Sequence, residues 1–220
     1  MMTLVARLQH IHRRRRELRG RYDPSRSFKS LEESCIPSYC HPNLLAAYVA
    51  WWRLFVAARL AATHVHSGPV LDFGASCGEF GHLLPGNWEY HFVEQHEALA
   101  SELLKERPQV SRQHLERLPS SFYKVVFALD SLEHNDDPGM ILSLLKKSLC
   151  DDGVLILSGP TENLLYRLGR RVSGFGGHYH KTTIYEIHKA ASQMLSPLNI
   201  ISGPVGTRLF IVSAWKPCAA

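Results

Sequence analysis

An apolar segment that ends in an acid and a glycine-rich turn is the part of this sequence best suited to binding a ligand. Residues 70–81 read VLDFGASCGEFG, in which Asp72 closes a strand-like run and Gly74 and Gly78 permit a tight backbone turn. Glu94 follows a second strand-like run about twenty residues after Gly74, where a carboxylate can accept hydrogen bonds from both hydroxyls of a ribose. The spacing therefore predicts a site for a nucleotide-like cofactor.

Other kinds of site compete for the same turn. A dinucleotide-binding G-x-G-x-x-G would need glycine where Ser76 and Glu79 stand, and a P-loop would need a lysine that does not follow Gly78. The string from Gly74 to Gly78 also matches G-x-S-x-G, the nucleophile elbow of the α/β-hydrolases. Because no HGGG-like segment precedes Ser76, a serine esterase using Ser76 is the alternative and not the first prediction.

Four segments, in the expected order, resemble the class I S-adenosylmethionine-dependent methyltransferases. The family's first motif is a strand followed by D-x-G-x-G-x-G, and serine replaces the middle glycine here. The later segments are similar to the fourth strand with its following turn, to the fifth strand, and to an H-x-H-x-x-T segment before the fifth helix. The matching residues are Asp72, Gly74, Ser76 and Gly78, then 125–138 (VVFALDSLEHNDDP), 153–160 (GVLILSGP) and 177–188 (GHYHKTTIYEIH), within about 43–215.

The resemblance implies S-adenosylmethionine as the methyl donor and S-adenosylhomocysteine as its product. The glycine turn would pass close to the methionyl part, with Asp72 near the amino end, and Glu94 would hold the ribose. His114 stands where the family often carries an Asp for the adenine, and serine suits position 76 if its φ angle is negative. The expected cofactor-binding residues are Asp72, Gly74, Ala75, Ser76, Gly78, Glu94, Gln95, His114, Leu115 and Asp130.

Three histidines are the candidates for proton transfer. His134 belongs to the LEH turn, and His178 and His180 lie in a loop expected to close over the acceptor; imidazole titrates near neutral pH. A structural role stays open for each of them, because in-line displacement at a sulfonium needs alignment and exclusion of water more than a strong base. No metal site is expected, since Cys35, Cys40 and His41 lack a fourth ligand.

The segment 161–177 is the expected lid over the acceptor. Its Arg170 and Arg171 favour an acidic or sugar-linked acceptor, with a solvated basic helix as the alternative. The sequence therefore predicts methyl transfer to a small-molecule or glycan-like acceptor. A non-catalytic, methyltransferase-like binding protein is a further alternative.

The elements that must position these residues alternate between strand and helix, which indicates an α/β fold with a parallel sheet covered on both faces. The family's sheet is doubly wound, mostly parallel, seven-stranded and Rossmann-like, with an antiparallel last strand, and here an N-terminal helical extension precedes it. The expected strands are 70–73, 90–93, 110–114, 124–129, 153–158, 198–201 and 209–215, and the expected helices are 78–84, 96–106, 138–149 and 183–195.

Residues 1–42 are expected to form a basic arm ahead of a methyltransferase domain at 43–220. The first thirty residues hold nine Arg or Lys against two acids, and Arg13–Arg16 form a continuous run. A solvated basic helix that packs an apolar stripe on the domain is favoured, and peripheral contact with an anionic membrane surface is the alternative. Nucleic acid is not an expected partner, because no stacking-aromatic platform or helix-turn-helix accompanies the arginines.

Residues 44–62 approach the length of a membrane span. Arg53 near their centre would cost about 2.5–3.5 kcal/mol in a bilayer, so a helix that covers the sheet is expected, with Tyr48, Trp52, Phe55 and Val56 inward. A length of 220 residues fits one domain. The five cysteines do not form a disulfide framework and no signal peptide is readable, which together favour the cytoplasm.

Overall fold

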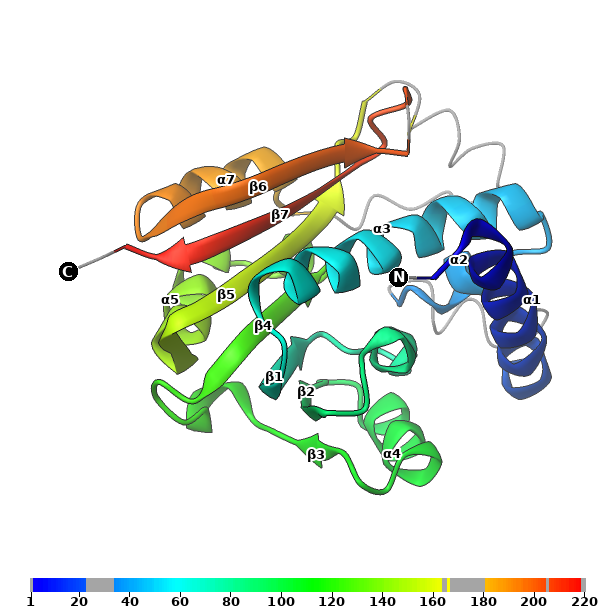
Figure 1. Ribbon diagram of the computed structural model, residues 1–220, viewed down its shortest axis with the longest axis horizontal. Coiled ribbons are helices and arrows are strands. Elements are labelled where there is room, and N and C mark those ends of the chain that lie inside the picture. The colour runs from blue at the N-terminus through cyan, green and yellow to red at the C-terminus, as the bar shows by residue number, and fades with distance from the viewer. Residues whose placement is uncertain (1, 23–33, 164–165, 167–180, 205, 219–220) are drawn as a thin grey trace.

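The computed structural model describes residues 2–22, 34–163, 166, 181–204 and 206–218 (Figure 1). Within these residues, seven strands form one sheet in the order β3-β2-β1-β4-β5-β7-β6. Strands β1 to β5 run parallel where they pair, whereas β7 is antiparallel to both β5 and β6. The predicted sheet is confirmed. The strands are β1 (Gly68–Phe73), β2 (Trp88–Val93), β3 (Ser111–Arg112), β4 (Tyr123–Leu129), β5 (Leu149–Pro160), β6 (Leu195–Gly203) and β7 (Phe210–Pro217).

Helices cover both faces of the sheet, because successive side chains of each central strand point to opposite faces and both faces are apolar. Val70 and Phe127 belong to the core cluster on one face, and Leu71 and Val126 to the cluster on the other. The first face packs against α1 (Leu4–Arg21), α2 (Ile36–Tyr39), α3 (Leu44–His64), the 3₁₀ turn η1 (Glu79–Leu83) and α4 (Glu97–Glu106). The second packs against α5 (Pro138–Ser148) and α7 (Ile184–Ser192), with the 3₁₀ turns η2 (Leu115–Arg117) and η3 (Leu132–His134).

Three elements differ from the predicted ones. The helix expected at 78–84 is the 3₁₀ turn η1, because Gly78 has a left-handed φ of 77° and the remaining segment is too short for an α-helix. The strand expected at 110–114 is reduced to β3, an edge strand that pairs with β2 at only two positions. The closing hairpin is longer than predicted, since antiparallel pairing runs from Leu195 opposite Pro217 to Gly203 opposite Phe210.

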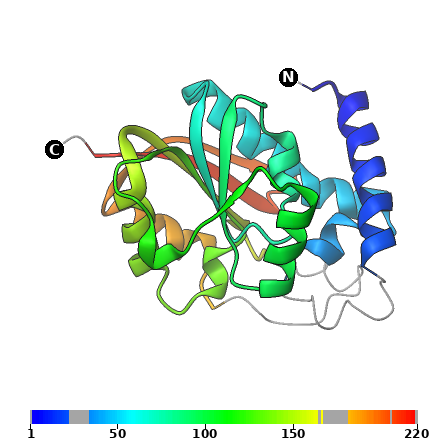
Figure 2. The ribbon, with the colours of Figure 1, turned by 90° about the horizontal axis from the view of Figure 1, so that it is seen from below.

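The long apolar helix α3 lies between the sheet and the N-terminal helices (Figures 1 and 2). Trp51 and Leu54 are fully buried, whereas Tyr48 and Trp52, expected to point inward, are half-buried. All four side chains expected to point inward, those two with Phe55 and Val56, lie in or against the core cluster, so that prediction is confirmed, and Trp51 and Leu54 are buried too because α3 is packed from two sides. By length and composition α3 could cross a membrane, but 56% of its most apolar window is buried inside the fold, as in a core helix.

The arginine run of α1 is only half solvated, which corrects the expectation of a solvated basic helix. Arg14 is buried and donates two hydrogen bonds to Glu79, at 2.8 and 2.5 Å. Arg15 is also buried and donates to the carbonyl oxygen of His41. Arg13 and Arg16 are exposed, and Ile11 and Leu18 of α1 belong to the core cluster on the sheet. The predicted boundary after residue 42 stays a prediction.

Candidate active site

The candidate site lies where β1, β2 and β4 end side by side. Phe73 is in register with Val93 of β2 and with Ala128 of β4, so the residues after these strands meet at one edge of the sheet. Gly74, Glu94 and Asp130 therefore come together from three separate parts of the chain. The carboxyl edge of a parallel sheet is where such folds bind ligands.

The glycine turn after β1 brings bare backbone to this edge. Gly74 has a φ of 77°, and a Cβ on it would lie 2.5 Å from the Cβ of Ser131 in the turn after β4. Gly78 also has a φ of 77°, and a Cβ there would lie 2.3 Å from Leu103 of α4. The backbone N–H groups of Gly74 and Ala75 both donate to the carbonyl oxygen of Val93, which fixes the turn on β2. Glycine is required at both positions by angle and by space.

Ser76 corrects one expectation about this turn. Its φ is +52° and not negative, so serine occupies the left-handed conformation that the family's middle glycine would adopt without strain. The Ser76 hydroxyl is buried and has no hydrogen-bond partner among the described residues. A hydrolase nucleophile would hydrogen-bond to a histidine base, so the geometry does not support the esterase alternative.

Replacing Ser76 by glycine is therefore expected to stabilise the protein. Relief of the left-handed strain is worth about 1–2 kcal/mol and the added chain entropy of glycine opposes it by about 0.5–1 kcal/mol, leaving a net gain of about 0–1.5 kcal/mol. Urea unfolding followed by tryptophan fluorescence measures the change. A Ser76→Gly protein that is less stable than wild type would mean that the serine side chain makes a stabilising contact.

Asp72 is buried at the end of β1, beside the turn. The Tyr90 hydroxyl donates to its Oδ2 at 2.5 Å, and Arg107 lies over the Tyr90 ring at 4.7 Å from the centroid. Burial raises the pKa of Asp72 to about 7, although the hydrogen bond from Tyr90 works in the opposite direction. A cation that binds nearby would therefore lower this pKa and convert the Asp72 carboxyl group to its charged form.

This pKa has a defined effect on stability. Between the ordinary pKa of 3.8 and about 7 the folded protein keeps the proton that the unfolded chain loses, so the free energy of unfolding falls as pH rises through this window. Asp72→Asn keeps an acceptor for Tyr90 and removes the titration. We expect wild type to lose more stability than Asp72→Asn between pH 4 and pH 7, roughly the ends of that window, as measured by urea midpoints. Equal losses would contradict the assigned pKa.

Glu94 follows the end of β2, on the second side of the candidate site. Its two carboxylate oxygens accept hydrogen bonds from the backbone N–H groups of Ser76 and His96, both at 2.7 Å. Each oxygen keeps a further lone pair, so the carboxylate can still accept from a ligand hydroxyl. Gln95 beside it is exposed. His114 is exposed and Leu115 half-buried at the start of η2, which follows β3.

Asp130 lies at the end of β4 in a network that the sequence did not predict. Its φ is +51°, its Oδ2 lies 2.5 Å from the Arg53 Nε, and its Oδ1 accepts a hydrogen bond from Ser158 at 2.7 Å. Arg53 is 3% exposed, donates to the Cys35 sulfur at 3.3 Å and lies over the ring of Phe210. Arg53, whose charge argues against a membrane span, thus links α3 to the turn after β4.

Glu133 and His134 form η3, directly after this turn. Glu133 is buried and its backbone carbonyl accepts from the N–H of Lys181 at 2.8 Å, which joins the segment before α7 to the β4 turn. His134 is half-buried at the same edge. His178 and His180, and the lid arginines Arg170 and Arg171, lie outside the described residues.

Sequence reasoning missed the support that the N-terminal helices give to this edge. Arg53 holds Asp130, and Arg14 of α1 holds Glu79, the first residue of η1. Glu106 of α4 also pairs with Arg14 at 3.1 Å, and hydrogen bonding to Arg21 followed by the charge of Arg14 lowers the pKa of Glu106 to about 2. Isolated arginines and acids far apart in the sequence give no spacing signal, so no pattern could have identified these pairs.

The edge fits S-adenosylmethionine on the chemistry of its residues. Glu94 lies beside the turn from Gly74 to Gly78 and offers acceptors for two ribose hydroxyls, and Asp72 is an acid next to the same turn. The donor carries an amino group and a positively charged sulfur, both of which favour a nearby carboxylate. The residues present can therefore hold the methionyl and ribose parts.

Several solved structures have the same fold at low sequence identity. Magnesium protoporphyrin IX methyltransferase (ChlM) from Synechocystis PCC 6803, solved with bound S-adenosylhomocysteine, has a TM-score of 0.61 and 17% identity over 80% of this chain and 88% of that chain. The N-methyltransferase NodS from Bradyrhizobium japonicum WM9, in complex with S-adenosylhomocysteine, has a TM-score of 0.62 and 11% identity over 77% and 88%. The PH0226 protein from Pyrococcus horikoshii OT3 has a TM-score of 0.63 and 16% identity over 76% and 90%.

The sequence comparisons point to the same family. No curated protein matches this chain in sequence. A family model described as a methyltransferase domain matches residues 51–194, which is more than half of the chain and includes β1, the glycine turn, Glu94 and the β4 turn. Family and fold together establish the donor as S-adenosylmethionine. The chain belongs to the class I S-adenosylmethionine-dependent methyltransferases.

Proposed function

We propose that this methyltransferase acts on a small-molecule or glycan-like acceptor that binds beside the turn after β4. The observation that carries the proposal is the meeting of Gly74, Glu94 and Asp130 at one edge, with the β4 turn in contact with the glycine turn. A porphyrin methyltransferase and an N-methyltransferase share the fold, which supports an acceptor of metabolite size.

In the proposed mechanism the protein positions two reactants. Bound S-adenosylmethionine supplies a methyl group on a positively charged sulfur. Glu94 accepts hydrogen bonds from the ribose hydroxyls, the turn that contains Ala75 and Ser76 follows the methionyl part, and Asp72 faces its amino end. Gln95, His114 and Leu115 border the adenine. Alignment within a water-poor pocket supplies most of the rate enhancement.

The acceptor side is formed by the β4 turn and the segment before α7. Asp130 shapes the turn, and His134, His178 and His180 are the histidines proposed to orient the acceptor or take its proton. Arg170 and Arg171 are proposed to contact an acidic or phosphorylated part of the acceptor. The two arginines and two of the three histidines belong to the segment between the described residues 166 and 181, so the sequence is their support.

Calorimetry and methyl transfer test this function together. We expect S-adenosylhomocysteine to bind and to raise the melting temperature, and tritiated methyl groups to pass from the donor to a component of a deproteinised small-molecule extract. Binding without transfer to any acceptor would favour a non-catalytic binding protein. Unchanged transfer by the Arg170→Ala, Arg171→Ala variant would exclude the anionic acceptor.

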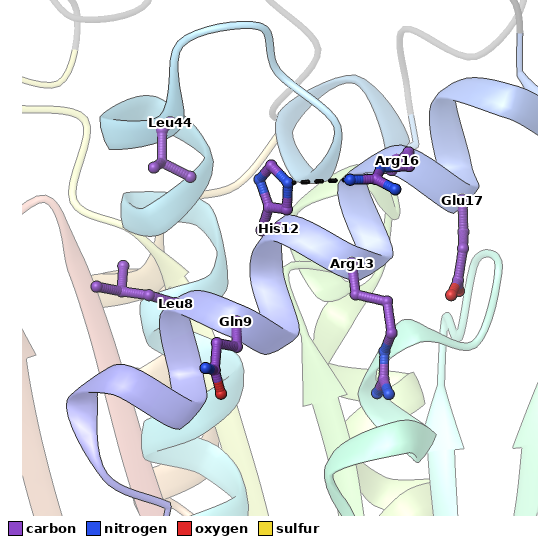
Figure 3. A pocket seen from close by; sticks show the side chains of 7 residues that line it. All are labelled: Leu8, Gln9, His12, Arg13, Arg16, Glu17 and Leu44. Carbon is purple, nitrogen blue, oxygen red and sulfur yellow. Dashed lines mark hydrogen bonds between the residues drawn. The ribbon is translucent and has the colours of Figure 1, made fainter.

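We also propose that an apolar patch at the N-terminal end contacts an anionic membrane surface. This N-terminal patch consists of Leu4, Val5, Leu8, Leu44 and Leu45, all exposed, and Leu45 is 71% exposed. Leu8 of α1 and Leu44 of α3 line a hollow of about 520 Å³. Figure 3 shows both leucines, with Arg13 and Arg16 further along α1. Exposed apolar side chains flanked by arginines suit an interfacial helix on acidic lipid.

Vesicle sedimentation tests the N-terminal patch. We expect the protein to sediment with vesicles of phosphatidylcholine and phosphatidylglycerol but not with phosphatidylcholine alone. Arg13→Gln with Arg16→Gln should weaken binding roughly 30-fold, at about 1 kcal/mol for each arginine. Ile200→Glu, which changes an exposed apolar residue on β6, is the control. A dimer in gel filtration that dissociates on Leu45→Glu would assign the patch to a second copy instead.

The cytoplasm is the proposed location. All five cysteines are free: Cys40 and Cys77 are buried, Cys35 and Cys150 are half-buried, and Cys218 is exposed. Free thiols persist in a reducing compartment. Fractionation of the native cells, with the free-thiol content measured after lysis under alkylating conditions, tests this; disulfide-linked protein would contradict it.

A further inference from the structure

The carboxyl group of Glu133 has no explanation within the fold. Its side chain is 1% exposed, yet neither of its oxygens has a hydrogen-bond partner among the described residues. Other buried acids of the same protein are paired, since Glu79 accepts from Arg14 and Asp72 accepts from Tyr90. An unpaired buried polar group costs about 1–3 kcal/mol. A group retained at that cost is a candidate for function.

The position of Glu133 is fixed by its own backbone. It follows β4 in η3, and its carbonyl oxygen accepts from Lys181 N–H at 2.8 Å and is approached by Thr182 N–H at 3.4 Å. Ser131, two residues before it, is the residue that a Cβ on Gly74 would touch. The backbone of Glu133 is therefore anchored in the turn after β4, two residues from the residue that borders the glycine turn.

The charged groups around Glu133 come from several elements. Asp130 at the end of β4, Glu162 after β5 and Arg53 on α3 act on it electrostatically, and Cys35 before α2 is affected by Glu133 in turn. His134 is its neighbour in the chain, and the Lys181 side chain pairs with Asp136. Acids thus outnumber bases among the described groups that act on this carboxyl. Such a setting disfavours a thiolate, carboxylate or phosphate as the reacting group and favours a hydrogen-bond donor.

We propose that Glu133 is a catalytic residue that accepts a hydrogen bond from the nucleophilic hydroxyl or amine of the acceptor and takes its proton during methyl transfer. This inference rests on the proposed function. It names the class of acceptor atom, oxygen or nitrogen bearing hydrogen.

The proposed step balances without a further reactant. A lone pair of the acceptor oxygen or nitrogen forms a bond to the methyl carbon while the carbon–sulfur bond breaks, and its electron pair stays on the sulfur, which becomes neutral. The positive charge passes to the acceptor and is lost when the acceptor proton moves to the Glu133 carboxylate, from which it leaves to water. Burial, followed by the charge of Asp130, raises the pKa of Glu133 well above its usual range, which makes its carboxylate a stronger base.

Stability measurements separate this role from a structural one and need no acceptor. We expect Glu133→Gln to leave the melting temperature unchanged and Glu133→Leu to raise it by about 2–4 °C, the shift expected from removing an unpaired buried carboxyl worth about 1 kcal/mol. Glu79→Gln is the matched control, because it alters an equally buried but paired acid, and it should lower the melting temperature. A loss of stability in Glu133→Leu as large as in Glu79→Gln would overturn the proposal.

Methyl transfer supplies the second readout. The probes are tritiated S-adenosylmethionine with glucosamine, with ethanolamine, and with a deproteinised extract of the native cells. The kcat/KM of wild type should rise with pH and then level off. Glu133→Gln should have a kcat/KM about 100-fold lower that no longer rises with pH, because a general base contributes on the order of 10²-fold or more. Its affinity for S-adenosylhomocysteine should stay within about twofold of wild type, because less than 1 kcal/mol is then lost.

The outcomes distinguish this inference from the proposed function. If wild type did not bind S-adenosylhomocysteine, the proposed function itself would be contradicted. Normal binding with equal transfer and equal pH profiles in wild type and Glu133→Gln would overturn the role of Glu133 alone. A metal requirement would also overturn it. If a chelator abolished methyl transfer and magnesium restored it in wild type but not in Glu133→Gln, Glu133 would be a metal ligand and not a base.

Discussion

Arg53→Met is expected to lower the free energy of unfolding by about 3–5 kcal/mol, because it removes one partner of a buried ion pair and leaves the other charge uncompensated. Arg53 is 3% exposed, its Nε lies 2.5 Å from Asp130 Oδ2, and its other nitrogens donate to the Ala50 carbonyl and the Cys35 sulfur. Methionine preserves most of the apolar stem. Urea unfolding followed by tryptophan fluorescence measures the loss.

Two further variants make this expectation decisive. Arg59→Met changes an exposed arginine of the same helix and should alter stability by no more than about 0.5 kcal/mol. Asp130→Asn keeps a side chain that tolerates the left-handed φ of 51° at this position, and in the double variant with Arg53→Met it removes the orphaned charge. The double variant should therefore lose less stability than the two single variants combined. Equal losses in Arg53→Met and Arg59→Met would show that the pair contributes nothing.

Glu94→Ala is expected to weaken binding of S-adenosylhomocysteine about 100-fold, and Glu94→Gln about 10-fold. Each hydrogen bond to a charged carboxylate is worth about 1.5–3 kcal/mol, and glutamine keeps one acceptor while losing the charge. Isothermal calorimetry gives the dissociation constants. Glu116→Ala, which changes an exposed acid of η2, should bind as wild type does.

Loss of the ribose contact must be separated from damage to the turn, because Glu94 also accepts from the Ser76 and His96 N–H groups. The comparison of 5′-methylthioadenosine with its 2′-deoxy analogue does this. Wild type should prefer the ribose compound, and Glu94→Ala should bind both equally even where its overall affinity is lower. A preference that survives in Glu94→Ala would assign the ribose to another residue.

The N-terminal helices connect stability to the proposed chemistry. Arg53 of α3 holds the turn that carries Asp130 and precedes Glu133, and Arg14 of α1 holds the first residue after the glycine turn. Both loops that are proposed to border the reactants are thus attached by ion pairs to the N-terminal helices, which the family model only partly covers because its match begins at residue 51. Changes in this segment should therefore affect donor and acceptor binding without touching either ligand.

Much of the fold follows from local patterns in the sequence. The apolar runs that become β1, β2, β4 and β5 are short and bounded by turn residues, and each lies at the predicted place within a few residues. The antiparallel hairpin was predicted from two apolar runs around Gly203 and Gly206, and it is longer because cross-strand pairing extends a strand beyond its most apolar part. The 3₁₀ form of η1 was not predicted, because the difference between 3₁₀ and α over five residues has no sequence signal.

The donor half of the candidate site was also predicted from spacing, since Asp72, the glycine turn and Glu94 lie at ends of strands that neighbour each other in sequence and in the sheet. The geometry of Ser76 was predicted wrongly, because a single serine in a glycine motif does not reveal whether the chain keeps the left-handed angle. Here the turn is held on β2 by two hydrogen bonds to the Val93 carbonyl, and the serine adopts the angle that the turn imposes.

The sequence by itself determined the order of strands and helices, the glycine turn and the position of Glu94 after the next strand, because these depend on residues close together along the chain, and the family resemblance indicated the donor. Only the tertiary structure decided which distant charges meet: Arg53 with Asp130, Arg14 with Glu79, and Glu133 buried with no partner among the described residues. The physical reason is that burial and pairing of a charge depend on what packs against it from other elements. Neither the type of residue nor its spacing along the chain carries that information.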